Sequence, residues 1–109
     1  MTNLELIEFV EAHLIKQGAK SMMPGSFYEC AYRGEAGLKC AAGCLIEDEF
    51  YCEELEGDNA KDETVKFALI ASGVMHNQID LVHRLQVMHD SCPVREWEQE
   101  IQILKSMVE

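Results

Sequence analysis

Sulfur-bearing side chains that could bind a metal gather around the stretch CAYRGEAGLKCAAGCLI, residues 30–46. Zinc takes four Cys or His ligands in a tetrahedral array. The candidate ligands are Cys30, Cys40, Cys44 and either Cys52 or His89. Structural zinc sites usually contain two closely spaced cysteine pairs, and only Cys40 and Cys44 form one here. The favoured interpretation is therefore buried thiols acting as small apolar side chains, with no metal or cofactor. A small zinc-binding structural domain is the alternative.

Catalytic chemistry is less well supported by the residue types. A nucleophilic cysteine needs an exposed thiolate beside positive charge, and near the Cys40–Cys44 pair only Arg33 and Lys39 provide any. His89 and Asp90 resemble an acid–base pair. His89 lies on the apolar face of its predicted helix, however, which is typical of a core histidine bonded to a nearby carbonyl or carboxylate. The sequence therefore predicts a protein that is not an enzyme.

Acidic side chains are concentrated in one segment of a chain whose net charge is −11. Residues 47–63 contain nine acids against the single base Lys61, so this segment carries eight of the eleven net negative charges. Such a charge disfavours direct binding to nucleic acid and to anionic membranes. The segment is either a solvated face or a contact surface for a basic partner, with imitation of nucleic acid left open. The acids predicted to make the contact are Glu49, Glu53, Glu54 and Glu56, and reversing their charges is expected to leave the fold intact.

A small-ligand site is a further alternative. Arg33 follows Tyr32 in the predicted turn and would attract an anion. Together with Trp97 these residues would line a pocket between helices, which would make the protein a binding sponge for a nucleotide-like ligand.

The elements that must position these residues are mostly helical. Thr2 and Glu5 form a capping box that predicts a helix over 3–17, ended by Gly18. The segment FYECAYR, residues 27–33, is rich in strand formers, and GEAG would turn it into a short β-hairpin. A short helix is predicted over 38–46, in which Gly43 would allow close backbone packing.

Three further helices complete the predicted fold. The apolar run 65–71 predicts a helix capped by Asp62 or Thr64 and ended at Gly73, and a second helix is expected over 78–91. The last helix starts at Pro93, and its apolar stripe is Val94, Trp97, Ile101, Leu104 and Val108. We expect one domain over residues 1–109: mainly α, with four to five helices and a short β-hairpin after the first.

The first residues of the chain and its apolar runs indicate in which cell compartment the protein acts. The first residues form an amphipathic pattern rather than a signal peptide, and no apolar run is long enough to cross a bilayer. The five cysteines are an odd number, which argues against a disulfide framework. These features predict a cytoplasmic protein, and they leave its oligomeric state open.

The stretch over 30–46 also resembles a family of small uncharacterised bacteriophage and prophage proteins with the pattern C-x-Y-R-G-x-x-G-x-K-C-A-x-G-C-L-I. The matching residues are Cys30, Tyr32, Arg33, Gly34, Gly37, Lys39, Cys40, Ala41, Gly43, Cys44, Leu45 and Ile46. Glu47 replaces a proline that often follows, and His89, Asp90 and Trp97 match a later part of the pattern. The resemblance implies the cytoplasm of a bacterial host and no particular activity. The leading hypothesis is a non-catalytic accessory protein that binds a host or defence protein.

Overall fold

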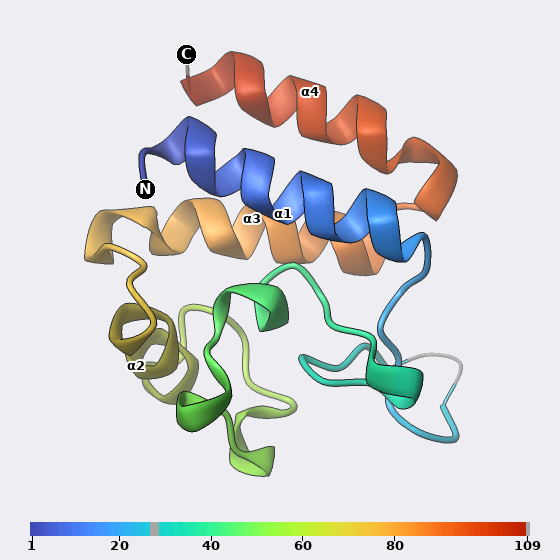
Figure 1. Cartoon of the computed structure of the whole chain (residues 1–109), viewed down its shortest axis with the longest axis vertical. Helices are drawn as coiled ribbons and strands as arrows, with labels where there is room; N and C mark the ends of the chain where they lie inside the picture. Colours follow the sequence, from blue (N-terminus) through green and yellow to red (C-terminus); the bar gives the residue numbers. More distant parts are fainter. Residues whose placement is uncertain (27–28, 109) are drawn as a thin grey trace.

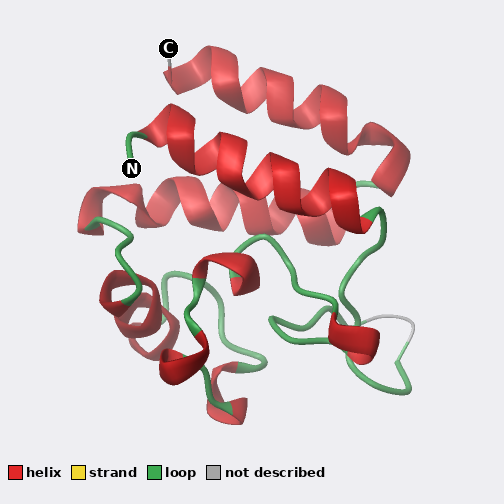
Figure 2. Ribbon diagram, in the orientation of Figure 1, coloured by secondary structure: helices red, strands yellow, loops and turns green. Residues whose placement is uncertain are grey.

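The computed structural model describes residues 1–26 and 29–108, and its regular elements are helices (Figures 1 and 2). The four α-helices are α1 (Asn3–Gln17), α2 (Glu63–Ala71), α3 (Ile79–Ser91) and α4 (Trp97–Val108). Helices α1, α3 and α4 run side by side across one half of the molecule, with α4 packed on both α1 and α3 (Figure 1). Residues 18–62 form the other half together with α2, as loops and short 3₁₀ turns (Figure 2). Among the described residues no helix is both long and apolar enough to span a membrane.

The helical half follows the sequence pattern closely. The Thr2 hydroxyl accepts from the Glu5 N–H at 3.1 Å, and the Glu5 carboxylate accepts from the Thr2 N–H at 2.8 Å, which confirms the capping box. Gly18 ends α1 with φ +66°, a conformation that favours glycine. The buried face of α1 consists of Leu6, Ile7, Val10 and Leu14, and that of α4 is centred on Trp97 and Ile101. These two stripes meet in the core.

The expected β-hairpin over 27–37 is wrong. The structure contains no strand within 1–26 and 29–108, only two isolated antiparallel bridges, between Met22 and Cys30 and between Arg33 and Lys39. Phe27 and Tyr28, at the start of the expected first strand, lie outside the described residues. Over the described residues the fold class is therefore mainly α without a hairpin, and the described part of the segment after α1 contains no strand.

Helix side chains add to the few backbone hydrogen bonds around the two bridges. The backbone N–H of Ser21 donates to Nε2 of His89 at 3.1 Å, and that of Ala42 donates to Oε1 of Gln86 at 2.9 Å. The N–H of Lys39 donates to the Gln17 side chain at 2.9 Å. Buried backbone donors must find a partner, and here helix side chains provide it. The loop is therefore fastened to α1 and α3 by directional hydrogen bonds.

The short helix expected over 38–46 is also corrected, because only the 3₁₀ turn Gly43–Leu45 forms there. Leu38 remains extended, and Lys39 is held in its bridge with Arg33. The close packing predicted at Gly43 is confirmed: a Cβ atom there would lie 2.1 Å from the carbonyl oxygen of Tyr32. Only glycine allows this approach of two backbone segments.

The remaining helix ends differ by a few residues from the pattern. Asp62 occupies the N-cap of α2, but its carboxylate accepts from the Asn59 N–H rather than from the helix. A turn at His76–Gln78 precedes α3. Pro93 precedes the turn Val94–Glu96, from which α4 continues, so proline lies just outside the helical segment rather than at its first position.

Candidate functional site

The cysteines proposed as zinc ligands are dispersed. Cys40 is fully buried and its sulfur accepts from the Gly43 N–H, whereas Cys44 donates to the carbonyl of Ala41 at 3.1 Å. Cys52 lies exposed within the acidic segment, residues 47–63. In the described part of the chain, one group of three potential ligand atoms lies within 4.8 Å of one another, and it consists of Cys30, His89 and Asp90.

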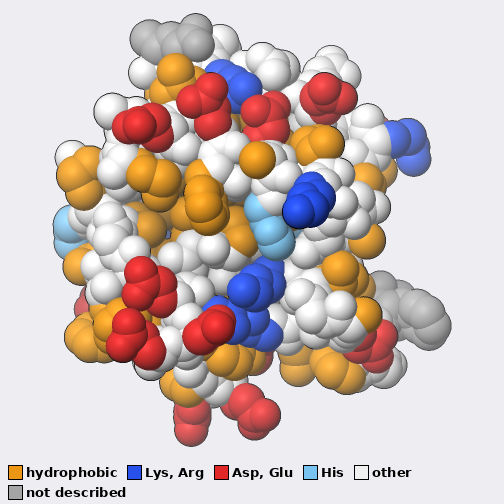
Figure 3. Space-filling model, in the orientation of Figure 1, with side chains coloured by type: hydrophobic (Ala, Val, Ile, Leu, Met, Phe, Trp, Pro, Cys, Tyr) orange, Lys and Arg blue, Asp and Glu red, His pale blue; other side chains and the backbone are white. Residues whose placement is uncertain are grey.

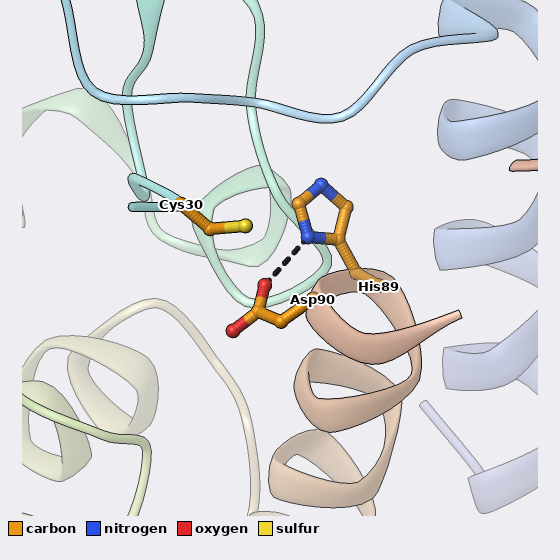
Figure 4. A group of neighbouring side chains, drawn as sticks. All are labelled: Cys30, His89 and Asp90. Atoms are coloured by element: carbon orange, nitrogen blue, oxygen red, sulfur yellow. Dashed lines mark hydrogen bonds and ion pairs between the residues drawn. The ribbon is translucent and has the colours of Figure 1, made fainter. Parts of the chain in front are cut away.

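These three side chains converge where the loop meets the end of α3 (Figure 4). Nδ1 of His89 lies 2.7 Å from the Asp90 carboxylate. Because Nε2 accepts the Ser21 N–H, that nitrogen carries no proton, and the proton of the neutral ring is on Nδ1 and is donated to Asp90. A metal on Nδ1 would force this proton to Nε2, directly against the Ser21 N–H. The geometry therefore suits a polar core contact better than a metal site.

The Cys30 thiol is not poised as a nucleophile. Burial raises the pKa of Cys30 to about 11, and the charge of Asp90 and a hydrogen bond to it act in the same direction. Burial likewise raises the pKa of Cys44 to about 12. Both groups are thus neutral thiols near neutral pH, and the thiolate is the nucleophilic form.

The prediction of a core histidine is confirmed, since His89 is fully buried and stacks on Trp97 with ring centroids 5.3 Å apart.

A hollow of about 220 Å³ opens next to this cluster. The polar groups lining it are Tyr32, Asp58, Asn59, His83, Gln86 and Asp90. Neither Arg33 nor Trp97 is among the described residues that line it, and those residues include two carboxylates but no lysine or arginine. A phosphate-bearing ligand would be repelled there, so the hollow does not suit the nucleotide-like ligand that Arg33 and Tyr32 suggest in sequence.

Arg33 and Tyr32 are used within the fold instead. The Arg33 guanidinium lies 2.8 Å from the Asp48 carboxylate, donates to the Ile46 carbonyl at 2.8 Å and sits 4.7 Å from the centre of the Tyr51 ring. The Tyr32 hydroxyl donates to the Asp58 carbonyl, and burial raises the pKa of Tyr32. Both residues therefore connect the loop over 30–46 to the acidic segment.

The four acids predicted as a contact surface fall into two groups. The Glu56 carboxylate accepts from the backbone N–H of Tyr32 at 2.8 Å, from that of Arg33 at 3.1 Å and from the Tyr51 hydroxyl at 2.7 Å. Glu56 is therefore an internal anchor, and reversing its charge would disturb the fold, contrary to the sequence expectation. The other three, Glu49, Glu53 and Glu54, are exposed, and none makes an ion pair with another described residue.

An apolar groove of about 400 Å³ lies beside these exposed acids. Of the three exposed acids, Glu49 and Glu54 line the groove. The other lining residues are Phe50, Tyr51, Cys52, Leu55 and, from α2, Thr64, Phe67 and Ala68. The Phe67 side chain is 71% exposed, the largest exposure among the large hydrophobic residues described. Figure 3 shows acidic and apolar side chains mixed over this lower corner of the molecule, around α2.

The comparisons with known proteins add no relationship. No protein-family model matches the chain, no curated protein is significantly similar to it, and no solved structure matches it significantly.

The groove was not predicted from the sequence, although one feature of the sequence indicates it. The run over 65–71 is apolar on nearly every side of the helix, which is unusual for a helix at a surface. The pattern predicts a helix but does not identify its exposed side, and Phe67 shows that one of its faces is not buried. The site is therefore better described by Glu49, Glu53, Glu54 and Phe67 than by four acids alone.

Proposed function

We propose that this protein is a non-catalytic accessory protein that acts by binding a basic partner protein through residues 47–63 and the adjoining face of α2. The setting of the proposal, a bacteriophage or prophage protein acting on a host or defence protein in the bacterial cytoplasm, comes from the resemblance of the motif over 30–46. The observation that carries the binding role is the exposure of Phe67 next to Glu49 and Glu54, which make no ion pair with another described residue.

The chemistry of this surface supports protein binding. Glu49, Glu53 and Glu54 have no cation among the described residues to pair with, so their field is available to a partner. Phe67 and the groove offer apolar area that water covers in the free protein. Buried aromatic anchors surrounded by a polar rim carry much of the binding energy in protein interfaces. The charges would steer the partner, and the groove would retain it.

A pair of charge-reversed variants tests the proposal. Glu49→Lys with Glu54→Lys changes the charge beside the groove, and Glu8→Lys with Glu98→Lys makes the same change at exposed positions on α1 and α4. Tagged proteins would be used to capture partners from a lysate of the bacterial host, with each recovered protein quantified by mass spectrometry. We expect a specific partner with the wild type and the control pair, reduced about tenfold or more by the groove pair.

Two outcomes would contradict the proposal. One is equal recovery of every partner by the groove pair and the control pair. The other is the absence of any partner whose recovery falls as salt concentration rises, because a contact between opposite charges must weaken with screening. Circular dichroism and thermal melting of all variants would verify that each remains folded.

A further inference from the structure

Helix α2 has two apolar faces, and the fold uses only one of them. Val65, Ala68 and Leu69 are buried against the rest of the molecule. On the opposite side, Phe67 is 71% exposed and Ile70 is 40% exposed, three residues apart and therefore neighbours on the helix surface. A helix that is apolar all round is normally buried all round. The outer face of α2 therefore lacks the cover that its sequence requires.

The groove beside this face has a shape against which another helix could pack. Thr64, Phe67 and Ala68 of α2 make one wall, and their spacing of three and four residues forms a ridge along the helix. Phe50 and Leu55 contribute apolar surface from the turns that precede α2. Packing of one helix against another uses ridges and grooves of this kind. A partner helix could thus extend the contact from the groove onto Ile70.

Charge decides which occupant fits. Glu49 and Glu54 stand at the groove, and Lys66, the cation on α2, is already 3.4 Å from the Glu63 carboxylate. A second copy of this chain would bring two strongly acidic segments together, and an anionic membrane would meet the same repulsion. Pairing with an extended peptide would need an open strand edge, and the described residues contain no strand.

We infer that the outer face of α2 and its groove dock a basic amphipathic helix of the partner, with an apolar side chain against Phe67 and lysines or arginines facing Glu49 and Glu54. This inference depends on the proposed function, because both use the same acids, and it adds the secondary structure and the residue pattern of the partner segment. Amphipathic helices bind apolar grooves through side chains spaced three and four residues apart.

Two synthetic peptides serve as probes. Both consist of leucine and lysine in equal amounts and are blocked at both ends. One places its leucines on a single helical stripe, and the other has the same composition in scrambled order. Titrations followed by calorimetry would use the full-length protein. We expect the striped peptide to bind about tenfold more tightly than the scrambled one, because only the stripe presents a continuous apolar face.

Matched variants locate the binding site. Phe67→Ser removes the exposed ring. Ile103→Ser is the control, because it removes a side chain on α4 that is 49% exposed and does not line the groove. We expect Phe67→Ser to weaken binding of the striped peptide about tenfold and Ile103→Ser to leave it unchanged. Because Phe67 is mostly exposed and Ile103 about half exposed, both variants should fold, which thermal melting would verify.

The outcomes separate this inference from the proposed function. Equal affinity for the two peptides, or an unchanged affinity in Phe67→Ser, overturns the helix-docking inference. Concentration-dependent dimers that disappear in Phe67→Ser, seen by sedimentation, also overturn it by identifying a second copy as the occupant. Loss of a captured host partner in the Glu49 and Glu54 variant would sustain the proposed function even if the striped peptide failed to bind.

Discussion

The two halves of this molecule reach a stable structure by different means. The helical half, α1, α3 and α4, is held mainly by apolar burial, with Leu6, Leu14 and Ile101 completely removed from water. The half formed by residues 18–62 with α2 has little regular structure outside that helix, and several of its backbone donors bond to side chains such as those of His89 and Glu56. The hydrophobic effect does not depend on the orientation of the apolar groups. A hydrogen bond does, and it is lost when its acceptor atom is replaced by a donor.

This difference predicts how each half responds to substitution. The helical half should tolerate loss of polar groups and suffer from loss of volume. The irregular half should suffer from changes that preserve volume but reverse a donor and an acceptor. Three substitutions test the two expectations, and their predicted effects on stability decrease from Trp97→Ala through Glu56→Gln to Glu5→Gln.

Trp97→Ala should have the largest effect on stability. Trp97 is fully buried, stacks on His89 and donates from Nε1 to the Cys92 carbonyl at 3.1 Å. Its removal should lower the free energy of unfolding by about 3–5 kcal/mol, as for other large-to-small core changes. Urea denaturation followed by circular dichroism measures this loss. Ile103→Ala on the same helix is the control, and a similar loss in both variants would refute the role given to burial.

Glu56→Gln should have an intermediate effect, because it keeps the shape of the side chain and replaces one acceptor oxygen by an NH₂ donor. That donor would face the backbone N–H of Tyr32 or Arg33, both of which now donate to the carboxylate. We expect a loss of about 1–3 kcal/mol in the free energy of unfolding. The same substitution at exposed Glu53 should change stability by less than about 0.5 kcal/mol. Equal denaturation midpoints for the two variants would show that Glu56 does not anchor the loop.

Glu5→Gln should have the smallest effect, although it alters a polar contact in the helical half. The hydrogen bonds with Thr2, first that of its backbone N–H, lower the pKa of Glu5 below the ordinary value of 4.5. A lowered pKa in the folded state stabilises the protein above the unfolded-state pKa, and this contribution is lost as pH falls through the lower folded-state value. Thermal melting should therefore show a small destabilisation at neutral pH that disappears in acid. A difference from wild type that persists unchanged at acid pH would rule out this linkage, and Glu8→Gln provides the control.

Local signals predicted the four α-helices well, although the short helix expected over 38–46 does not form. The capping box at Thr2 and Glu5, the stop at Gly18 and the stripe through Trp97 all involve residues within a few positions of each other. A helix forms its own hydrogen bonds over the same short range, so sequence and structure report the same contacts. The close approach at Gly43 was predictable for a similar reason, because a glycine between small residues allows backbone contact whatever element surrounds it.

The failure of the expected hairpin to form was not predictable. Two of its backbone N–H groups donate to a side chain that lies far away in the sequence. Strand-forming residues over 27–33 suggest a ladder, yet Tyr32 and Arg33 donate to Glu56, more than twenty residues later. Ser21 donates to His89 across 68 residues. No local pattern identifies these acceptors. The bonds to Tyr32 and Arg33 remove Glu56 from the predicted contact surface, and the contacts of the Arg33 guanidinium with Asp48 and the Ile46 carbonyl remove Arg33 from the predicted ligand site.

The sequence by itself determined the approximate positions of the four α-helices, the buried stripes of α1 and α4 and how strongly negative residues 47–63 are, since these depend on neighbouring residues and on composition. Tertiary structure alone decided which carboxylates point outward, which thiols are shielded and that Phe67 is left in water. The physical reason is that burial and hydrogen-bond partnership belong to pairs of distant segments. They exist only once the chain has brought those segments together.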